Sequence, residues 1–168
     1  MDGDDALRRA KRPRTILAGP YGHPFHALMI TIPIGAWTAS LVFDLVAIFG
    51  DSPEVFARGA AWLIGIGLVG GAAAAVLGFL DYLQLEKGTR VHRTARLHML
   101  INLAVLALML ISLIVRLAAD LDEVSVGGFV LSLLALLLLV VSGWLGGDLA
   151  YRHGVRVADE SDQRKAYR

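Results

Sequence analysis

The chain has 168 residues, of which 56% are hydrophobic and 18% are charged. Soluble domains contain fewer apolar and more charged residues, so this balance excludes an ordinary soluble domain. The net charge of +1 gives no basis for nucleic-acid binding, and the absence of cysteine excludes disulfides, thiolate metal sites and iron–sulfur ligation within the chain.

Four stretches of the chain are long and apolar enough to cross a bilayer as helices, which takes about 20 residues each. In chain order they cover residues 24–49, 55–83, 95–118 and 126–151. A basic tail, residues 1–23, precedes them, and a polar tail, residues 152–168, follows them. We therefore predict an all-α fold: an integral membrane four-helix bundle of up-down-up-down topology, with one transmembrane domain over residues 24–151.

The distribution of Lys and Arg predicts which side of the membrane each end faces. The two tails carry five each and the connection between the second and third stretches carries four, so only Arg58 and Arg116 lie elsewhere. The other two connections are acidic. Because cytoplasmic loops carry an excess of Lys and Arg, we predict that both tails are cytoplasmic, the N-in/C-in orientation.

Small residues predict where the helices approach one another, because close backbone contact holds helices together in lipid. They recur at four-residue spacing in the second and fourth stretches, at Gly67, Gly71 and Ala75, then at Gly143 and Gly147 with Gly146 beside them. The alternative is that these glycines leave room for a flat cofactor. Pro33 removes one backbone hydrogen bond from the first stretch and is expected to bend it.

One pair of opposite charges is predicted at the end of the bundle far from the tails. Asp44 lies 18 residues after His26, and Arg116 lies 18 residues after His98. At the helical rise, each charge is therefore roughly 27 Å from its histidine and at a matching depth. Since a pair shares the desolvation cost of burial, we predict a structural ion pair, with Arg58 as a rival partner for Asp44.

At the other end, all four helices bring polar residues to one layer. A charge at the centre of a membrane costs about 2.5–3.5 kcal/mol on insertion scales, so such residues need a partner or a function. The layer contains His23, His26, Asp81, His92, His98, Asn102, Asp148, Tyr151, Arg152 and His153. The simplest interpretation is that these side chains anchor helix ends at the lipid headgroups and cap one another.

A second interpretation of this layer is a haem site. A b-type haem takes one or two imidazoles that project inward from facing helices at equal depth. His26 and His98 meet the depth condition. Asn102 follows His98 by four residues and would help to fix its imidazole, and Arg152 would contact a haem propionate.

A third interpretation is a site for a zinc or iron ion, because imidazole and carboxylate groups suit both metals. The predicted ligands are His23, His26, Asp81, His98, Asp148 and His153. Asp148 and His153 are five residues apart, about 140° round a helix, so we do not expect these two to bind the same ion.

Four segments of the chain carry recognisable motifs. They are GHPFH at 22–26 with IPIG at 32–35, GFLDY at 78–82, LHMLINL at 97–103 and GWLGGDLAYRHGV at 143–155. Together they resemble the bacterial family catalogued as domain of unknown function 2231, whose members are predicted membrane proteins without an assigned activity. The chain departs from the family pattern at Asp148, where Glu is usual, and at Ala27, where a second proline is usual.

The resemblance implies a multi-pass protein of the bacterial plasma (inner) membrane. Some family members resemble fusions of this membrane unit with a Rieske-type iron–sulfur domain, which implies electron transfer and favours the haem interpretation. The expected partners are then the lipid bilayer, a redox partner protein or a quinone, and further copies of the chain in a homo-oligomer.

Our leading prediction is a small membrane electron-transfer protein that holds haem b between His26 and His98. The alternatives are a membrane protein that binds a metal ion, and a non-catalytic membrane subunit of a larger complex. The sequence gives little support for hydrolytic or nucleophilic catalysis, because Ser132 and Ser142 have no base at a helical spacing that reaches them, and a stand-alone enzyme is the less favoured expectation.

Overall fold

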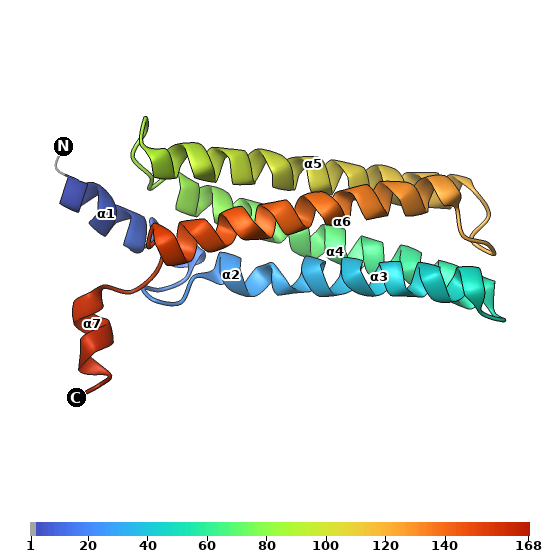
Figure 1. Ribbon diagram of the computed structural model, residues 1–168, viewed down its shortest axis with the longest axis horizontal. Helices are drawn as coiled ribbons and strands as arrows, with labels where there is room; N and C mark the ends of the chain where they lie inside the picture. The colour runs from blue at the N-terminus through green and yellow to red at the C-terminus, as the bar shows by residue number, and fades with distance from the viewer. Residues whose placement is uncertain (1–2) are drawn as a thin grey trace.

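Four long helical segments lie side by side in the computed structural model, which describes residues 3–168 (Figure 1). They are α2 (Phe25–Met29) with α3 (Thr31–Phe49), α4 (Pro53–Tyr82), α5 (Arg90–Ala118), and α6 (Val126–Gly147). Each segment is long and apolar enough to cross a bilayer, and the described residues contain no strand. The prediction of an all-α fold with four apolar helices is confirmed.

Consecutive helices run in opposite directions, so the bundle has two distinct ends (Figure 1). We call the end that holds both chain termini the terminal end, and the end with the α3–α4 and α5–α6 connections the distal end. The closest neighbours are α3 with α4 and α5 with α6; α4 also packs on α5, and α3 meets α6 over a smaller contact. The first helical segment and α5 therefore face each other across the bundle axis.

The first membrane segment is interrupted at Ile30, between α2 and α3 and close to Pro33, but the bend expected from Pro33 is not seen in Figure 1. Proline has no backbone N–H, so the carbonyl four residues earlier, that of Met29, receives no helical hydrogen bond. The chain stays nearly in line, because the N–H of Ile30 still donates to the carbonyl of His26 at 3.1 Å. The break leaves α2 as a short separate helix that carries His26 at the terminal end.

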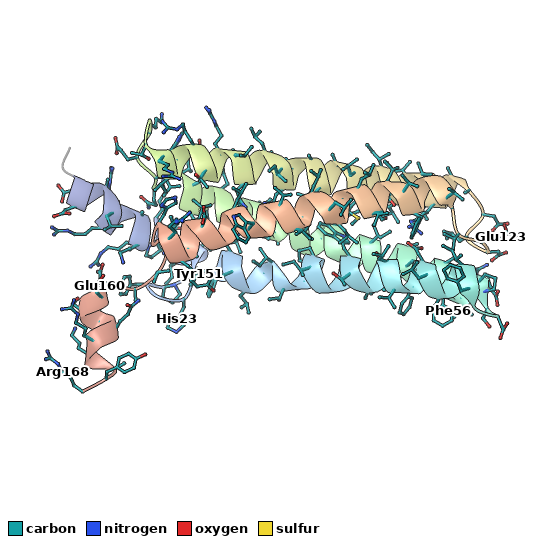
Figure 2. All side chains as sticks on the ribbon, viewed as in Figure 1. His23, Phe56, Glu123, Tyr151, Glu160 and Arg168 are labelled. Carbon is teal, nitrogen blue, oxygen red and sulfur yellow. The ribbon has the colours of Figure 1, made fainter. Side chains whose placement is uncertain are left out.

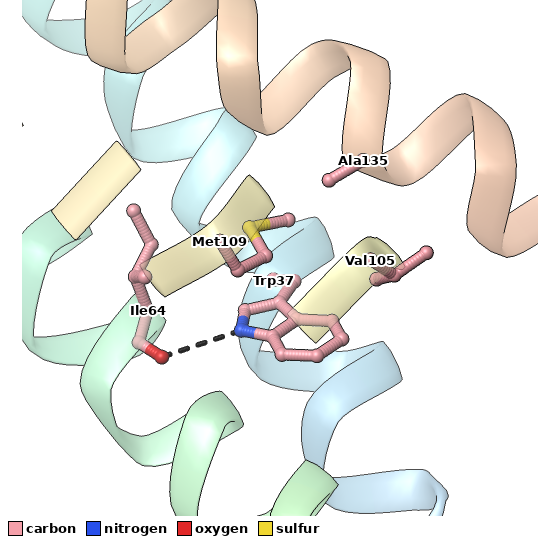
Figure 3. Close-up of a cluster of buried hydrophobic side chains, with 5 residues drawn as sticks. All are labelled: Trp37, Ile64, Val105, Met109 and Ala135. Atoms are coloured by element: carbon pink, nitrogen blue, oxygen red, sulfur yellow. Dashed lines mark hydrogen bonds between the residues drawn. The ribbon is translucent and has the colours of Figure 1, made fainter. Parts of the chain in front are cut away.

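The centre of the bundle is a packed apolar cluster with one large ring (Figure 3). Its buried members are Trp37, Ile64, Val105, Met109 and Ala135. The indole Nε1–H of Trp37 donates to the carbonyl of Ile64 at 3.3 Å, which satisfies the only polar atom of that ring. This cluster holds α3, α4, α5 and α6 together at mid-depth.

Glycines in α4 allow this packing, whereas two of the three glycines predicted for α6, Gly143 and Gly147, do not pack on a helix. A Cβ at Gly67 would lie 2.2 Å from Nε1 of Trp37, and one at Gly71 would lie 2.9 Å from Leu106. At Gly143 and Gly147 nothing lies within 4 Å of the Cβ position. The predicted close contact is confirmed at Gly67 and Gly71 and is wrong at Gly143 and Gly147, which face outward.

Large apolar side chains also cover the outside of the bundle (Figure 2). Val69, Trp62 and Trp144 are among the most exposed of them. Exposed apolar surface on this scale is typical of a protein face that meets another apolar medium. Together with the lengths of the helices, it supports a bilayer around the bundle.

Both tails contain short helices at the terminal end (Figure 1). They are α1 (Gly3–Lys11), the 3₁₀ turn η1 (Ile16–Ala18) and α7 (Glu160–Lys165). A second apolar cluster joins the N-terminal tail to the bundle through Ala10, Leu85, Ala95 and Leu149. The segments predicted as simple polar tails are therefore partly packed on the ends of α4, α5 and α6.

Candidate functional site

Two imidazoles meet near the bundle axis at the terminal end. His26 comes from α2 and His98 from α5, which face each other across the bundle. Their ring centroids are 6.3 Å apart and the ring planes are nearly perpendicular, at 84°. Both side chains are half-buried. The equal depth that the sequence predicted for these histidines is accompanied by convergence in space.

Backbone carbonyls fix the orientation of both rings. Nδ1 of His26 lies 2.8 Å from the carbonyl oxygen of Ala74, and Nδ1 of His98 lies 2.9 Å from that of Ser142. A carbonyl only accepts hydrogen bonds, so each Nδ1 carries a proton, and Nε2 of a neutral ring then carries a lone pair. Imidazoles that bind metals through Nε2 are commonly held in this way by a hydrogen bond at the other nitrogen.

Each imidazole lies directly against a glycine. A Cβ at Gly78 of α4 would lie 2.9 Å from Cε1 and Nδ1 of His26, and a Cβ at Gly146 of α6 would lie 3.2 Å from Cε1 of His98. A side chain at either position would push the ring away from its carbonyl acceptor. The GFLDY and GWLGGDLAYRHGV motifs thus supply the bare backbone on which the two rings rest.

The two Nε2 atoms have different surroundings. Asn102 lies with Nδ2 3.2 Å from Nε2 of His98, 2.6 Å from Oγ of Ser142 and 2.9 Å from the carbonyl oxygen of His98. An amide nitrogen has only two hydrogens, so it does not satisfy all three acceptors at once. Within residues 3–168, Nε2 of His26 takes part in no hydrogen bond. The two imidazoles therefore have at least one Nε2 lone pair that is available to bind a ligand.

A buried ion pair lies at the same end, between Asp81 of α4 and Arg156. Nε of Arg156 is 3.1 Å from Oδ1 of Asp81, and only 4% of the arginine side chain is exposed. Its Nη2 donates to the carbonyls of Ala18 and Gly19, both at 2.9 Å. Oδ1 of Asp81 and the Nε and Nη1 of Arg156 make no well-aligned hydrogen bond. The two charges are paired, but these three polar atoms remain without a hydrogen bond of good geometry.

Arg156 is the residue that the sequence interpretation missed, because it was assigned to a solvated tail. Its backbone has a φ of 61°, a conformation that is uncommon for a side-chain-bearing residue. Its N–H donates to the carbonyl of Ala10 at 3.0 Å. The available signals were Asp81, a membrane-embedded carboxylate that needs a cation, and Gly154, which lets the chain turn back after α6.

The remaining predicted ligands do not join the imidazole pair. His23 is exposed, with Nδ1 3.4 Å from the carbonyl oxygen of Tyr21. Asp148 pairs with Arg152 at 3.5 Å, and the side chain of Arg152 is 68% exposed. Among the residues that the structure describes, no three His, Asp or Glu side chains converge to hold a metal ion. The structure therefore brings together His26, His98 and Asn102, and leaves Arg152 outside.

The end of α6 widens into a π-helix, η2 (Asp148–Arg152). The N–H of His153 donates to the carbonyl of Asp148 at 2.9 Å, the five-residue spacing that defines such a turn. The wider turn buries Leu149 and leaves Tyr151 outside (Figure 2). Short π segments are frequent at functional sites, and this one lies on the same helix as Gly146 and Ser142.

The distal end contains the predicted ion pair. The guanidinium of Arg116 donates two parallel hydrogen bonds to Asp44, both 2.7 Å long, and the two side chains are 2% and 0% exposed. Arg116 also donates to Ser112 at 3.2 Å and to Ser132 at 3.4 Å. The rival cation, Arg58, pairs with Asp122 instead. The prediction of an Asp44–Arg116 pair is confirmed.

Comparison with known proteins identifies the family. The model of the family described as "Predicted membrane protein (DUF2231)" matches residues 22–159, which run from just before α2 to just beyond Arg156. No curated protein and no solved structure matches the chain. Both imidazoles and both buried ion pairs lie inside the matched region, and the chain belongs to the DUF2231 family of predicted membrane proteins.

Proposed function

We propose that this chain is a membrane electron-transfer protein that binds b-type haem at the terminal end through His26 and His98. The observation that carries the proposal is the imidazole pair near the bundle axis. Each ring is fixed by a carbonyl at Nδ1, so that Nε2 has the lone pair that an axial ligand requires. Haem bound there would supply one-electron transfer.

The donor set fits haem better than a free ion. A zinc or iron ion takes three or four ligands from the protein, and only two imidazoles converge among residues 3–168. Haem brings four nitrogens of its own and needs only axial ligands. His26 and His98 would hold the haem iron, each through the ring nitrogen that makes no hydrogen bond to a backbone carbonyl.

The neighbouring side chains would position the ligands. Ala74 and Ser142 hold the two Nδ1 atoms through their carbonyls. The amide of Asn102 would leave Nε2 of His98 and keep its bond to Oγ of Ser142, which is the shortest of its three contacts. Arg152, which was expected at a propionate, lies exposed and pairs with Asp148, so the proposal does not depend on it.

The proposed orientation is N-in/C-in, with the terminal end in the cytoplasm of a bacterium and the bundle in its plasma membrane. Arg14, Arg90 and Arg96 make no ion pair among the described residues, and they leave an excess of positive charge at the terminal end. The distal connections carry Asp51 and Glu123. This asymmetry supports the orientation, because cytoplasmic flanks are rich in Lys and Arg. A cytoplasmic redox protein or a quinone would then exchange electrons at this end.

An absorption spectrum of the detergent-purified chain, expressed with adequate haem supply, tests the proposal. We expect a Soret band that is lost in His26→Ala and in His98→Ala. His23→Ala is the matched control, because that imidazole is exposed and lies outside the pair, and it should keep the band. A wild-type protein without the band contradicts the proposal. Stoichiometric zinc or iron without porphyrin would then favour the metal-ion alternative, and neither would favour the subunit alternative.

A further inference from the structure

The segment before the first membrane helix exposes two large aliphatic side chains outside the four spans. Ile16 and Leu17, in η1, are 82% and 69% exposed. Arg12 and Arg14 lie on the same segment and are also exposed. Aliphatic side chains beside basic residues at a helix end are typical of segments that enter the boundary between headgroups and acyl chains.

This segment is fixed in place, so its exposed side chains have a defined position. Nη2 of Arg156 binds the carbonyls of Ala18 and Gly19, which end η1. The chain then reverses at Gly19, which has a φ of 89° and where a Cβ would lie 2.2 Å from the carbonyl oxygen of His23. The reversal brings η1 against α2 and α4. Ile16 and Leu17 are therefore held beside the terminal ends of membrane-spanning helices.

Neither basic residue of this segment makes an ion pair in the described chain: Arg14 has no carboxylate partner, and Arg12 feels Asp162 only electrostatically, because that carboxylate already pairs with Lys165. From Lys11 onward, every carboxylate at the terminal end pairs with another basic residue, in the pairs Asp81–Arg156, Glu86–Arg9, Asp148–Arg152, Asp159–Lys11, Glu160–Arg164 and Asp162–Lys165. Arg14 makes no hydrogen bond or ion pair in the described chain, and the guanidinium of Arg12 lies 5.3 Å from the ring centroid of Tyr21. Positive charge thus remains next to the two aliphatic side chains.

We propose that Arg12, Arg14, Ile16 and Leu17 form a binding site for an anionic phospholipid. The two guanidinium groups would bind the phosphate, because lipid phosphate is the anion found at the depth of a helix end. The acyl chain would cover Ile16 and Leu17. Charge complementarity selects an anionic lipid over a zwitterionic one, since only the former brings an uncompensated negative charge. The site does not require the haem proposal to hold.

The test is lipid binding to the purified full chain in detergent, followed by native mass spectrometry with phosphatidylglycerol and phosphatidylcholine. Wild type should prefer phosphatidylglycerol. The double variant Arg12→Gln/Arg14→Gln should bind it roughly tenfold to thirtyfold more weakly, from about 1 kcal/mol for each basic residue near the membrane surface. Arg152→Gln/Arg164→Gln removes two cations that already have carboxylate partners, and it should leave the preference unchanged.

A second variant tests the apolar half of the site. Ile16→Ser/Leu17→Ser should weaken the binding of both lipids while keeping the preference for the anionic one. Equal binding of the two lipids by wild type, or an undiminished preference in Arg12→Gln/Arg14→Gln, overturns the proposal. Far-ultraviolet circular dichroism checks that each variant keeps its helices, which is expected because all four side chains are exposed.

Discussion

The two ends of the bundle each bury a cluster of polar side chains, but they satisfy it differently. At the distal end, Arg116 and Asp44 share two parallel hydrogen bonds, and Ser112 and Ser132 take up the remaining contacts of the guanidinium. Ser112 in turn donates to the carbonyl of Gly128 at 2.7 Å. This cluster is closed, because its donors already meet acceptors within the protein.

At the terminal end, the polar cluster is open. Nε2 of His26 has no hydrogen-bond partner in the described chain, and the amide of Asn102 faces more acceptors than it has hydrogens. The Asp81–Arg156 pair also leaves donors and an acceptor without well-aligned bonds. A closed cluster fixes helix packing and has nothing left for a ligand, whereas an open cluster can bind one.

The largest expected effect is the loss of the closed distal cluster. Arg116→Ala leaves the carboxylate of Asp44 buried without a cation and should destabilise the protein by about 3–5 kcal/mol. Thermal unfolding in detergent measures this. The double variant Asp44→Leu/Arg116→Met should recover most of the stability, because well-packed apolar residues replace a buried pair at little cost. A single variant as stable as wild type would show that the pair does not hold this end together.

A smaller effect is expected from breaking the contacts of Arg156 with Asp81, Ala18 and Gly19 at the terminal end. Arg156→Gln removes the cation of Asp81 and the bonds to Ala18 and Gly19, so η1 should lose about 1.5–3 kcal/mol of local stability. Hydrogen exchange at the backbone amides around Gly19 measures it. Arg152→Gln is the control, because that arginine is mostly exposed and lies four residues away. Equal exchange in the two variants would contradict the role given to Arg156.

The smallest effect concerns the glycine beneath an imidazole. Gly78→Ala places a methyl group 2.9 Å from the ring of His26 and should destabilise the protein by about 1–3 kcal/mol through overpacking. Gly143→Ala, where the Cβ position is open, should instead be neutral or stabilise α6 by up to about 1 kcal/mol. If both variants unfold at the same temperature, the ring of His26 does not rest on Gly78 as described.

Counting residues along each helix predicted the depth of a side chain in the membrane well. It predicted poorly the direction in which the side chain faces around the helix axis. The spacing from His26 to Asp44 equals that from His98 to Arg116. The structure contains the ion pair that this equality predicts at one end, and it brings the two histidines together at the other. Spacing does not show which way a side chain faces, which is why Gly143 was expected at a helix contact. That depends on how each helix is turned against its neighbours.

The burial of Arg156 at the terminal end was not predictable from local sequence. Arg156 is buried because the chain after η2 turns back and meets Ala10, Ala18 and Gly19, which are more than 130 residues earlier. Composition alone identifies such a segment as a solvated basic tail. The contact exists only once both ends of the chain pack against α4, so periodicity within either tail carries no sign of it.

The haem content of three proteins, measured side by side, tests most directly whether the open end is the functional one. Wild type and Ser132→Ala, a variant of the closed distal cluster, should each bind haem, even though Ser132→Ala is less stable. His98→Ala should keep its helices and contain no haem. A folded wild-type protein without haem, or a loss of haem in Ser132→Ala as complete as that in His98→Ala, would contradict the account.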